Sequence, residues 1–176
     1  MQEVDLPEKL TELGLHLEIY EAQELPEKYL DQLIEKSRQA HVMEHEGHED
    51  AGGRFRDKRT FLDWSKDKRR VFYLLLSNED LAGVIWFGKR VNEHIEPKYS
   101  LTFAIRLYEG FVGRGLSKPF MGVAHDGMAK YFPGENIWLD FAADNLAAQK
   151  AYESFGYKYL KQHDGRIIMG LNKNGN

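Results

Sequence analysis

A glycine-rich segment that joins a predicted strand to a predicted helix is the first place where this sequence could do chemistry. Residues 107–117 read Leu-Tyr-Glu-Gly-Phe-Val-Gly-Arg-Gly-Leu-Ser. Glycines let backbone N–H groups face one point without a Cβ in the way, and the start of a helix adds the positive end of its dipole. Arg114 and Lys118 add positive charge. The segment therefore predicts a phosphate or pyrophosphate site, with an ordinary glycine-rich turn as the alternative.

A second segment, residues 145–157, predicts a helix with a face of small residues. It reads Asn-Leu-Ala-Ala-Gln-Lys-Ala-Tyr-Glu-Ser-Phe-Gly-Tyr, and Ala148, Ala151, Tyr152 and Phe155 fall on one side of such a helix. Alanine side chains would let a slender molecule lie close to the backbone, and Tyr152 follows Ala148 by one turn. The alternative interpretation is a core helix with a packed tyrosine.

The elements around these segments predict a mixed α/β fold around one sheet, in the order β-α-α-β-β-β-α-β-α-β-β. An antiparallel first half passes into a β-α-β unit, and Ser117 is the expected N-cap of the helix after the glycine-rich loop. We expect one domain over residues 1–176, its core at about 15–171, with a short N-terminal extension and a frayed C-terminal tail. The predicted elements are a short helix at 7–13, a strand at 15–20, a helix at 26–40, a long loop at 41–57, a short helix around 61–64, strands at 70–77, 81–89 and 101–107, a helix at 117–131, a strand at 137–142, a helix at 145–155, and strands at 157–161 and 166–171.

Length, charge and composition exclude several classes of protein. The 176 residues carry a net charge of −4, include no cysteine and are 42% hydrophobic. These values exclude a disulfide scaffold and a wholly disordered chain, and they do not fit a general nucleic-acid binder. The sequence shows neither a membrane span nor a signal-peptide pattern, so we expect a cytoplasmic monomer or homodimer.

Charge is unevenly distributed along the chain. Residues 1–50 hold 14 acidic and 4 basic residues, a balance of −10, whereas residues 51–176 have a balance of +6. The glycine-rich loop lies in the basic part, where a polyanion would bind. The acidic part predicts a cationic second ligand, with solvated helix faces as the alternative.

The predicted loop at 41–57 contains a short metal-binding pattern. His41-Val42-Met43-Glu44-His45 matches H-x-x-E-H, the pattern of a class of zinc hydrolases. A zinc hydrolase that uses His41, Glu44 and His45 is therefore a rival hypothesis. Such a pattern also arises by chance in a stretch rich in histidine and glutamate.

The two glycine- and alanine-containing segments together resemble the GNAT superfamily of N-acetyltransferases. The pyrophosphate loop of that family reads R/Q-x-x-G-x-G/A and lies between the fourth strand and the next helix. Residues 112–117 occupy that place, and Gly115 matches the central glycine. Val112 stands where Arg or Gln is usual, and Ser117 stands where Gly or Ala is usual.

The later helix of the family reads N-x-x-A-x-x-x-Y-x-x-x-G-F. Asn145, Ala148, Tyr152 and Gly156 match this motif, with Tyr157 in place of Phe. The resemblance implies one GNAT-like domain whose mostly antiparallel sheet splays between its fourth and fifth strands. It also implies transfer of acetyl from acetyl-CoA to a primary amine by direct attack, without a metal.

The resemblance implies a role for each matching residue. A backbone N–H near Leu107 would polarise the thioester carbonyl, and Tyr152 would be the general acid that protonates the departing CoA thiolate. The implied acetyl-CoA contacts are Ile105, Leu107, Val112, Gly113, Arg114, Gly115, Leu116, Ser117, Lys118, Asn145, Ala148 and Tyr152.

The acceptor side stays open at this point. The general base is Glu93, His94, Glu96 or water, with solvated loop residues as the alternative for the three side chains. The 41–57 loop would contact the acceptor amine through His41, Glu44, His45 and Glu46, with a plain surface loop as the alternative. A protein that binds acetyl-CoA without catalysis, as a sensor, is a third hypothesis.

Overall fold

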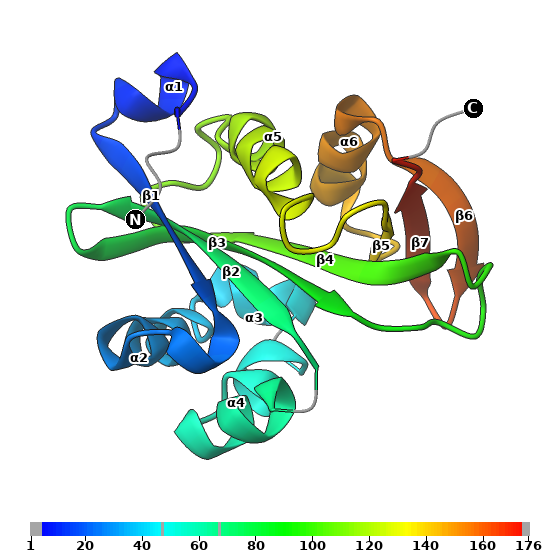
Figure 1. Ribbon diagram of the computed structural model, residues 1–176, viewed down its shortest axis with the longest axis horizontal. Helices are drawn as coiled ribbons and strands as arrows, with labels where there is room; N and C mark the ends of the chain where they lie inside the picture. Colours follow the sequence, from blue (N-terminus) through cyan, green and yellow to red (C-terminus); the bar gives the residue numbers. More distant parts are fainter. Residues whose placement is uncertain (1–4, 47, 67, 174–176) are drawn as a thin grey trace.

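A seven-stranded sheet forms the centre of the protein, in the order β1-β2-β3-β4-β5-β7-β6 (Figure 1). The computed structural model describes residues 5–46, 48–66 and 68–173. Only the β4–β5 pair within these residues is parallel, so the predicted mixed α/β, mostly antiparallel fold class is confirmed. The strands are β1 (Leu15–Glu21), β2 (Arg70–Ser77), β3 (Asp80–Lys89), β4 (Tyr99–Leu107), β5 (Asn136–Ala142), β6 (Lys158–His163) and β7 (Arg166–Leu171).

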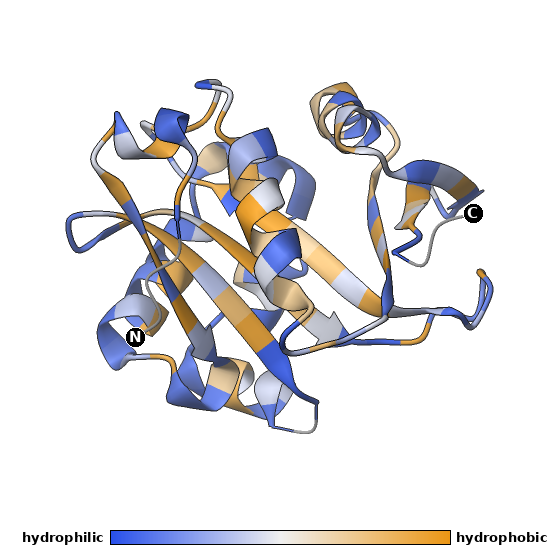
Figure 2. Cartoon of the chain, turned by 45° about the horizontal axis from the view of Figure 1, so that its top comes forward, coloured by the Kyte–Doolittle hydropathy of each residue, from blue (hydrophilic) through white to orange (hydrophobic). Residues whose placement is uncertain are grey.

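Helices cover both faces of the sheet (Figure 1). One face carries α1 (Glu8–Thr11), α5 (Ser117–Met128) and α6 (Leu146–Phe155), and the other carries α2 (Glu27–Lys36), α3 (Ala40–Glu46) and α4 (Lys58–Ser65). Alternate residues of each central strand therefore enter different cores. In β2, Val71 and Tyr73 join the core under α5, whereas Phe72 and Leu74 join the core under α2 and α4. Figure 2 shows the resulting hydrophobic stripe along the central strands.

The sheet opens between β4 and β5, as the resemblance predicted. Their parallel pairing ends where Thr102 meets Trp138, although β4 continues to Leu107. The N–H of Tyr108 donates to Ala82 on β3. Because successive residues of a strand direct their polar groups to opposite edges, Leu107 and the alternate residues before it direct theirs toward the gap.

Two local predictions were wrong. The predicted loop at 41–57 contains the helix α3 and the single π-helical turn η2 (Asp50–Arg54). A seven-residue helix that buries only Val42 leaves no readable periodicity, and η2 buries a charged residue, Asp50, rather than an apolar one. Ser117 is the first residue of α5 rather than its N-cap, because the buried Leu116 occupies that position.

The predictions for the two ends of the chain lie largely outside the residues that the structure describes. The predicted N-terminal extension and frayed tail fall largely on residues 1–4 and 174–176, outside the described part of the chain. None of the described helices is long and apolar enough to cross a membrane.

Candidate active site

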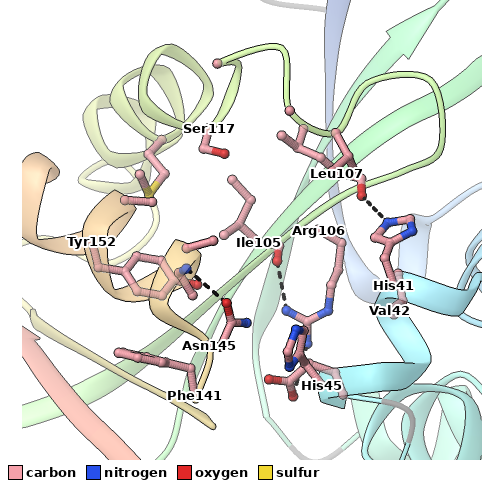
Figure 3. A pocket seen from close by; sticks show the side chains of 18 residues that line it. His41, Val42, His45, Ile105, Arg106, Leu107, Ser117, Phe141, Asn145 and Tyr152 are labelled. Atoms are coloured by element: carbon pink, nitrogen blue, oxygen red, sulfur yellow. Dashed lines mark hydrogen bonds and ion pairs between the residues drawn. The ribbon is translucent and has the colours of Figure 1, made fainter. Parts of the chain in front are cut away.

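A cavity of about 570 Å³ occupies the gap between β4 and β5 (Figure 3). Its walls come from the last residues of β4, the glycine-rich loop, the first turns of α5 and α6, and one face of α3. Nine of the twelve residues that the sequence predicted for acetyl-CoA line it. They are Ile105, Leu107, Val112, Gly113, Gly115, Ser117, Asn145, Ala148 and Tyr152.

The three other predicted residues do not line this cavity. Arg114 is exposed and donates to the carbonyl oxygen of Gly110 at 3.3 Å. The Leu116 side chain is fully buried in the core, and Lys118 lies on the first turn of α5 beside the cavity wall. The backbone of this loop, rather than its basic side chains, therefore faces the cavity.

The glycine-rich loop has the conformation that its sequence suggested. Gly113 and Gly115 both have positive φ angles, 76° and 70°, which other residues adopt only with strain. Ser117 then starts α5 and points its hydroxyl into the cavity (Figure 3). The first N–H groups of a helix have no partner within the helix, so this end of the cavity offers donors to an anion. Lys9 adds a cation beside this loop that sequence reasoning missed. A Cβ on Gly115 would lie 2.6 Å from the Nζ atom of Lys9.

Helix α6 begins and ends as its motif requires. The side chain of Asn145 caps the helix by accepting the N–H of Ala148 at 3.0 Å. Gly156 ends it in the left-handed conformation, at φ 118°. These two ends place Ala148 and Tyr152 on the cavity wall.

Tyr152 is the phenol at the inner end of the cavity (Figure 3). Its ring packs against Phe103 and Phe141, and its hydroxyl makes no hydrogen bond to any residue between 5 and 173 that the structure describes. Burial raises the pKa of Tyr152 to about 12, while the nearby Arg106 guanidinium acts in the opposite direction. The phenol therefore stays protonated at neutral pH and is free to donate a hydrogen bond.

Helix α3 brings side chains to the cavity that the sequence left in a loop. His41, His45 and Glu46 all line it, and the Nε2 atom of His41 lies 3.0 Å from the carbonyl oxygen of Leu107 (Figure 3). Glu44, in contrast, is exposed on the other side of α3. The zinc pattern therefore does not converge, and no group of three potential ligands within the described chain could hold a metal.

A network of buried charges lies beneath this cavity. Arg106 binds Asp50 through two contacts, at 2.7 and 3.4 Å, and lies 3.5 Å from Glu46. Glu46 also pairs with Arg166 at 3.3 Å, and Arg166 binds Asp140. Burial alone would lower the pKa of Arg106, but the charges of Asp50 and Glu46 outweigh it and raise that pKa well above its ordinary value. Sequence reasoning missed this network because its members come from four separate segments.

The structure does not bring the predicted base candidates to Tyr152. Glu93, His94 and Glu96 lie in the β3–β4 loop and border other cavities. Strand β4 separates that loop from Leu107, and its nine residues span roughly 27 Å.

Several solved structures with the same architecture are acetyltransferases. The aminoglycoside acetyltransferase AAC(6')-Ib, solved with ribostamycin and coenzyme A, matches with a TM-score of 0.68 and 16% identity over 91% of this chain and 94% of that one. Spermidine N-acetyltransferase from Vibrio cholerae, solved with CoA and spermine, gives 0.63 and 15% over 89% and 92%. The N-acetyltransferase PseH from Campylobacter jejuni, solved with acetyl coenzyme A, gives 0.59 and 15% over 90% and 99%.

These likenesses define the fold of the chain. No family model matches the sequence, and no curated protein matches it either. The chain has the fold of the GNAT N-acetyltransferases, so the predicted resemblance to that superfamily is confirmed at the level of the fold.

Proposed function

We propose that this protein is an acetyl-CoA-dependent N-acetyltransferase that moves acetyl to a primary amine by direct attack. The observation that carries the proposal is the cavity between β4 and β5, which runs from the glycine-rich loop to Tyr152. Three solved proteins with this fold hold CoA or acetyl-CoA, which supports the same ligand here.

The cavity fits a long, anionic thioester in size and in chemistry. One end offers backbone donors at Gly113, Gly115 and the start of α5, which suit a pyrophosphate. The middle is walled by Ala148 and by the edge of β4 that β5 does not reach, where pantetheine amides would bond as an added strand. Acetyl-CoA supplies an activated acyl carbon whose carbonyl oxygen gains negative charge when an amine attacks it.

The chain's own groups would stabilise that attack. The N–H of Leu107 faces the gap and would donate to the developing oxyanion, which is worth about 3 kcal/mol for a single donor in other enzymes. Tyr152 would donate its proton to the sulfur as the thiolate leaves, because its raised pKa keeps it in the acid form. The amine proton would leave through His45, Glu46 or water, since those two side chains line the cavity.

A CoA-release assay against a panel of amines tests this function. We expect release of the CoA thiol with at least one amine, and a Tyr152→Phe variant with unchanged acetyl-CoA affinity and a kcat lowered at least about tenfold. Calorimetry measures the affinity separately. Acetyl-CoA binding without thiol release from any amine would instead identify a sensor, and an unchanged kcat in Tyr152→Phe would remove Tyr152 from the mechanism.

A further inference from the structure

A second cavity meets the first one at the reacting end. It is a narrow space of about 60 Å³ on the α3–α4 face of the sheet, and it shares Glu46, Arg106 and Tyr152 with the larger cavity. It leads into a wider groove of about 390 Å³, with which it shares Arg54, Trp64 and other residues. An amine that attacks an acyl group beside Tyr152 can therefore approach from this opposite side.

Guanidinium and indole groups alternate along this route. The Arg106 guanidinium lies 5.2 Å from the Trp86 ring, and Arg54 lies 5.4 Å from the same ring. The Arg54 guanidinium also lies 5.5 Å from the centroid of the Trp64 ring. The Arg70 guanidinium lies 4.1 Å from the centroid of the same ring. The register of β2, β3 and β4 places Arg70 and Arg106 on the same face of the sheet. The guanidinium and indole groups thus form a continuous path from the reacting end to the surface.

The outer groove, defined by Arg54, Trp64, Lys68, Arg70 and Arg90 together with one carboxylate, has an excess of positive charge. Among the groove residues that the structure describes, which leave out position 67, Glu49 is the one acid, and it is already paired with Arg54. The Arg90 guanidinium is exposed and forms no ion pair with any side chain that the structure describes. Arginine guanidinium groups bind carboxylates and phosphates through paired hydrogen bonds.

We propose that the acceptor is a small amine that carries a carboxylate or phosphate at its other end, held in this outer groove. The inference rests on the proposed acetyltransfer, because it takes Tyr152 as the reacting end. It reverses the cationic acceptor that the charge of residues 1–50 predicted. Glu46, Glu49 and Asp50 belong to that acidic part, but arginines already neutralise all three.

The passage between the two cavities favours a small molecule over a protein. Its volume of about 60 Å³ admits an alkyl amine but leaves little room for a peptide backbone with side chains. The amine would enter this passage while the anionic end stays among Arg70 and Arg90.

A matched series of six-carbon amines tests the proposal. The acceptors are 6-aminohexanoate, 6-aminohexyl phosphate, the neutral 6-aminohexanamide and 1,6-diaminohexane, each measured by CoA release at low salt. We expect kcat/KM for one of the two anionic amines to exceed that of the amide and of the diamine by about tenfold or more, as one charged hydrogen bond would provide. The better anionic amine then shows whether the groove suits a carboxylate or a phosphate.

Two groove variants and one control localise the effect. Arg90→Gln and Arg70→Gln should each lower the ratio of kcat/KM for the anionic amine over the diamine by about tenfold. Arg59→Gln is the control, because Arg59 is an exposed arginine of α4 that lines neither cavity nor groove. It should keep the parent ratio. Since Arg90 is exposed, its variant is expected to fold.

Three results would overturn the proposal. The first is a kcat/KM for the diamine equal to that for the anionic amines. The second is a groove variant that lowers kcat/KM equally for all the amines. The third is a short acidic peptide with a higher kcat/KM than every six-carbon amine. Each of these leaves acetyltransfer itself intact. Failure of acetyl-CoA to bind by calorimetry, or of every amine to release CoA, would instead show that the proposed function is wrong.

Discussion

The two sides of the reacting end are built in different ways. On the α5–α6 side, the cavity wall consists of backbone groups, glycines and alanines, with Tyr152 at its inner end. On the α3–α4 side, charged side chains and indole rings form much of the wall, and one of them, Arg106, pairs with the buried Asp50. The α5–α6 side can bind a ligand of one shape through main-chain groups. The α3–α4 side binds through the charges of its side chains, so its preference depends on which residues are present. We therefore expect substitutions on the charged side to affect folding most, and substitutions on the backbone side to affect coenzyme binding most.

The largest effect is expected from breaking the charged side. Asp50 is 1% exposed and binds both Arg106 and Arg54, so Asp50→Asn leaves two guanidinium groups short of a countercharge. We expect the free energy of unfolding to fall by about 3–5 kcal/mol, the range for a buried pair that loses one partner. Urea denaturation followed by circular dichroism measures it.

An exposed ion pair provides the control for that measurement. Asp31 lies 3.0 Å from Lys58, and both side chains are exposed. Asp31→Asn should change the free energy of unfolding by less than about 1 kcal/mol. Equal losses in the two variants would show that burial does not distinguish the charged network.

The same contrast explains what the sequence could predict. The strands of the sheet and the helix after Asn145 follow from local patterns: alternation, glycine positions and a cap. The splay between β4 and β5 was implied by the resemblance alone. The resemblance named nine residues that line the cavity, but not Met121, Phe141 or Ala147. It also named side chains that point elsewhere, such as Arg114, whose direction no spacing rule fixes.

The charged side could not be predicted in the same way. Asp50, Arg106 and Arg166 lie far apart along the chain, and each reads as an ordinary surface residue by itself. Only the packing of α3 and η2 beside β4 and β7 brings Asp50 to Arg106 and Glu46 to Arg166. The H-x-x-E-H pattern misled for the related reason that a match of residue types does not show which side chains share a face.

A buried histidine under α5 and α6 stays uncharged, and this predicts how stability depends on pH. His125 is buried, and burial lowers its pKa to about 3. Its Nδ1 atom lies 2.7 Å from the Met121 carbonyl oxygen, and its Nε2 atom lies 2.7 Å from the Tyr157 hydroxyl. A neutral ring that donates to the carbonyl and accepts from the phenol satisfies both contacts.

The sign of the stability change follows from this shift. An unfolded histidine has a pKa near 6.5, so between about pH 6.5 and 3 the unfolded state binds a proton that the folded state does not. Stability from His125 is therefore complete above pH 6.5 and is lost as the pH falls toward 3. Between pH 6.5 and 4.5 we expect a loss of about 2 kcal/mol that is absent in His125→Gln. Urea unfolding of both proteins at several pH values measures the difference, and parallel curves would contradict a neutral His125.

A smaller effect is expected from straining the backbone side. Gly115→Ala places a Cβ at a φ of 70°, which strains the backbone of the loop, and 2.6 Å from the Nζ atom of Lys9, whose flexible side chain would have to move aside. We expect CoA affinity to fall by about fivefold to thirtyfold, in line with the cost of about 1–2 kcal/mol for a left-handed residue. Gly134→Ala is the matched control, because Gly134 has a φ of 73° and lies outside the cavity wall. It carries similar strain, so equal losses of affinity in both variants would remove the loop from coenzyme binding.

The smallest effect concerns Tyr152, which belongs to both sides. Because burial raises its pKa to about 12, the phenol should remain an acid at pH values where an ordinary tyrosine ionises. Attack needs the neutral amine, so the rate should rise with pH until the acceptor amine loses its proton. Because an alkyl amine loses its proton only near about pH 10.4, we expect kcat with saturating acetyl-CoA to keep rising to about pH 10.5 without a descending limb. A fall in kcat centred near pH 10 would mean that the phenol is solvated during catalysis, and that the charged side does not close over the reacting end as the structure indicates.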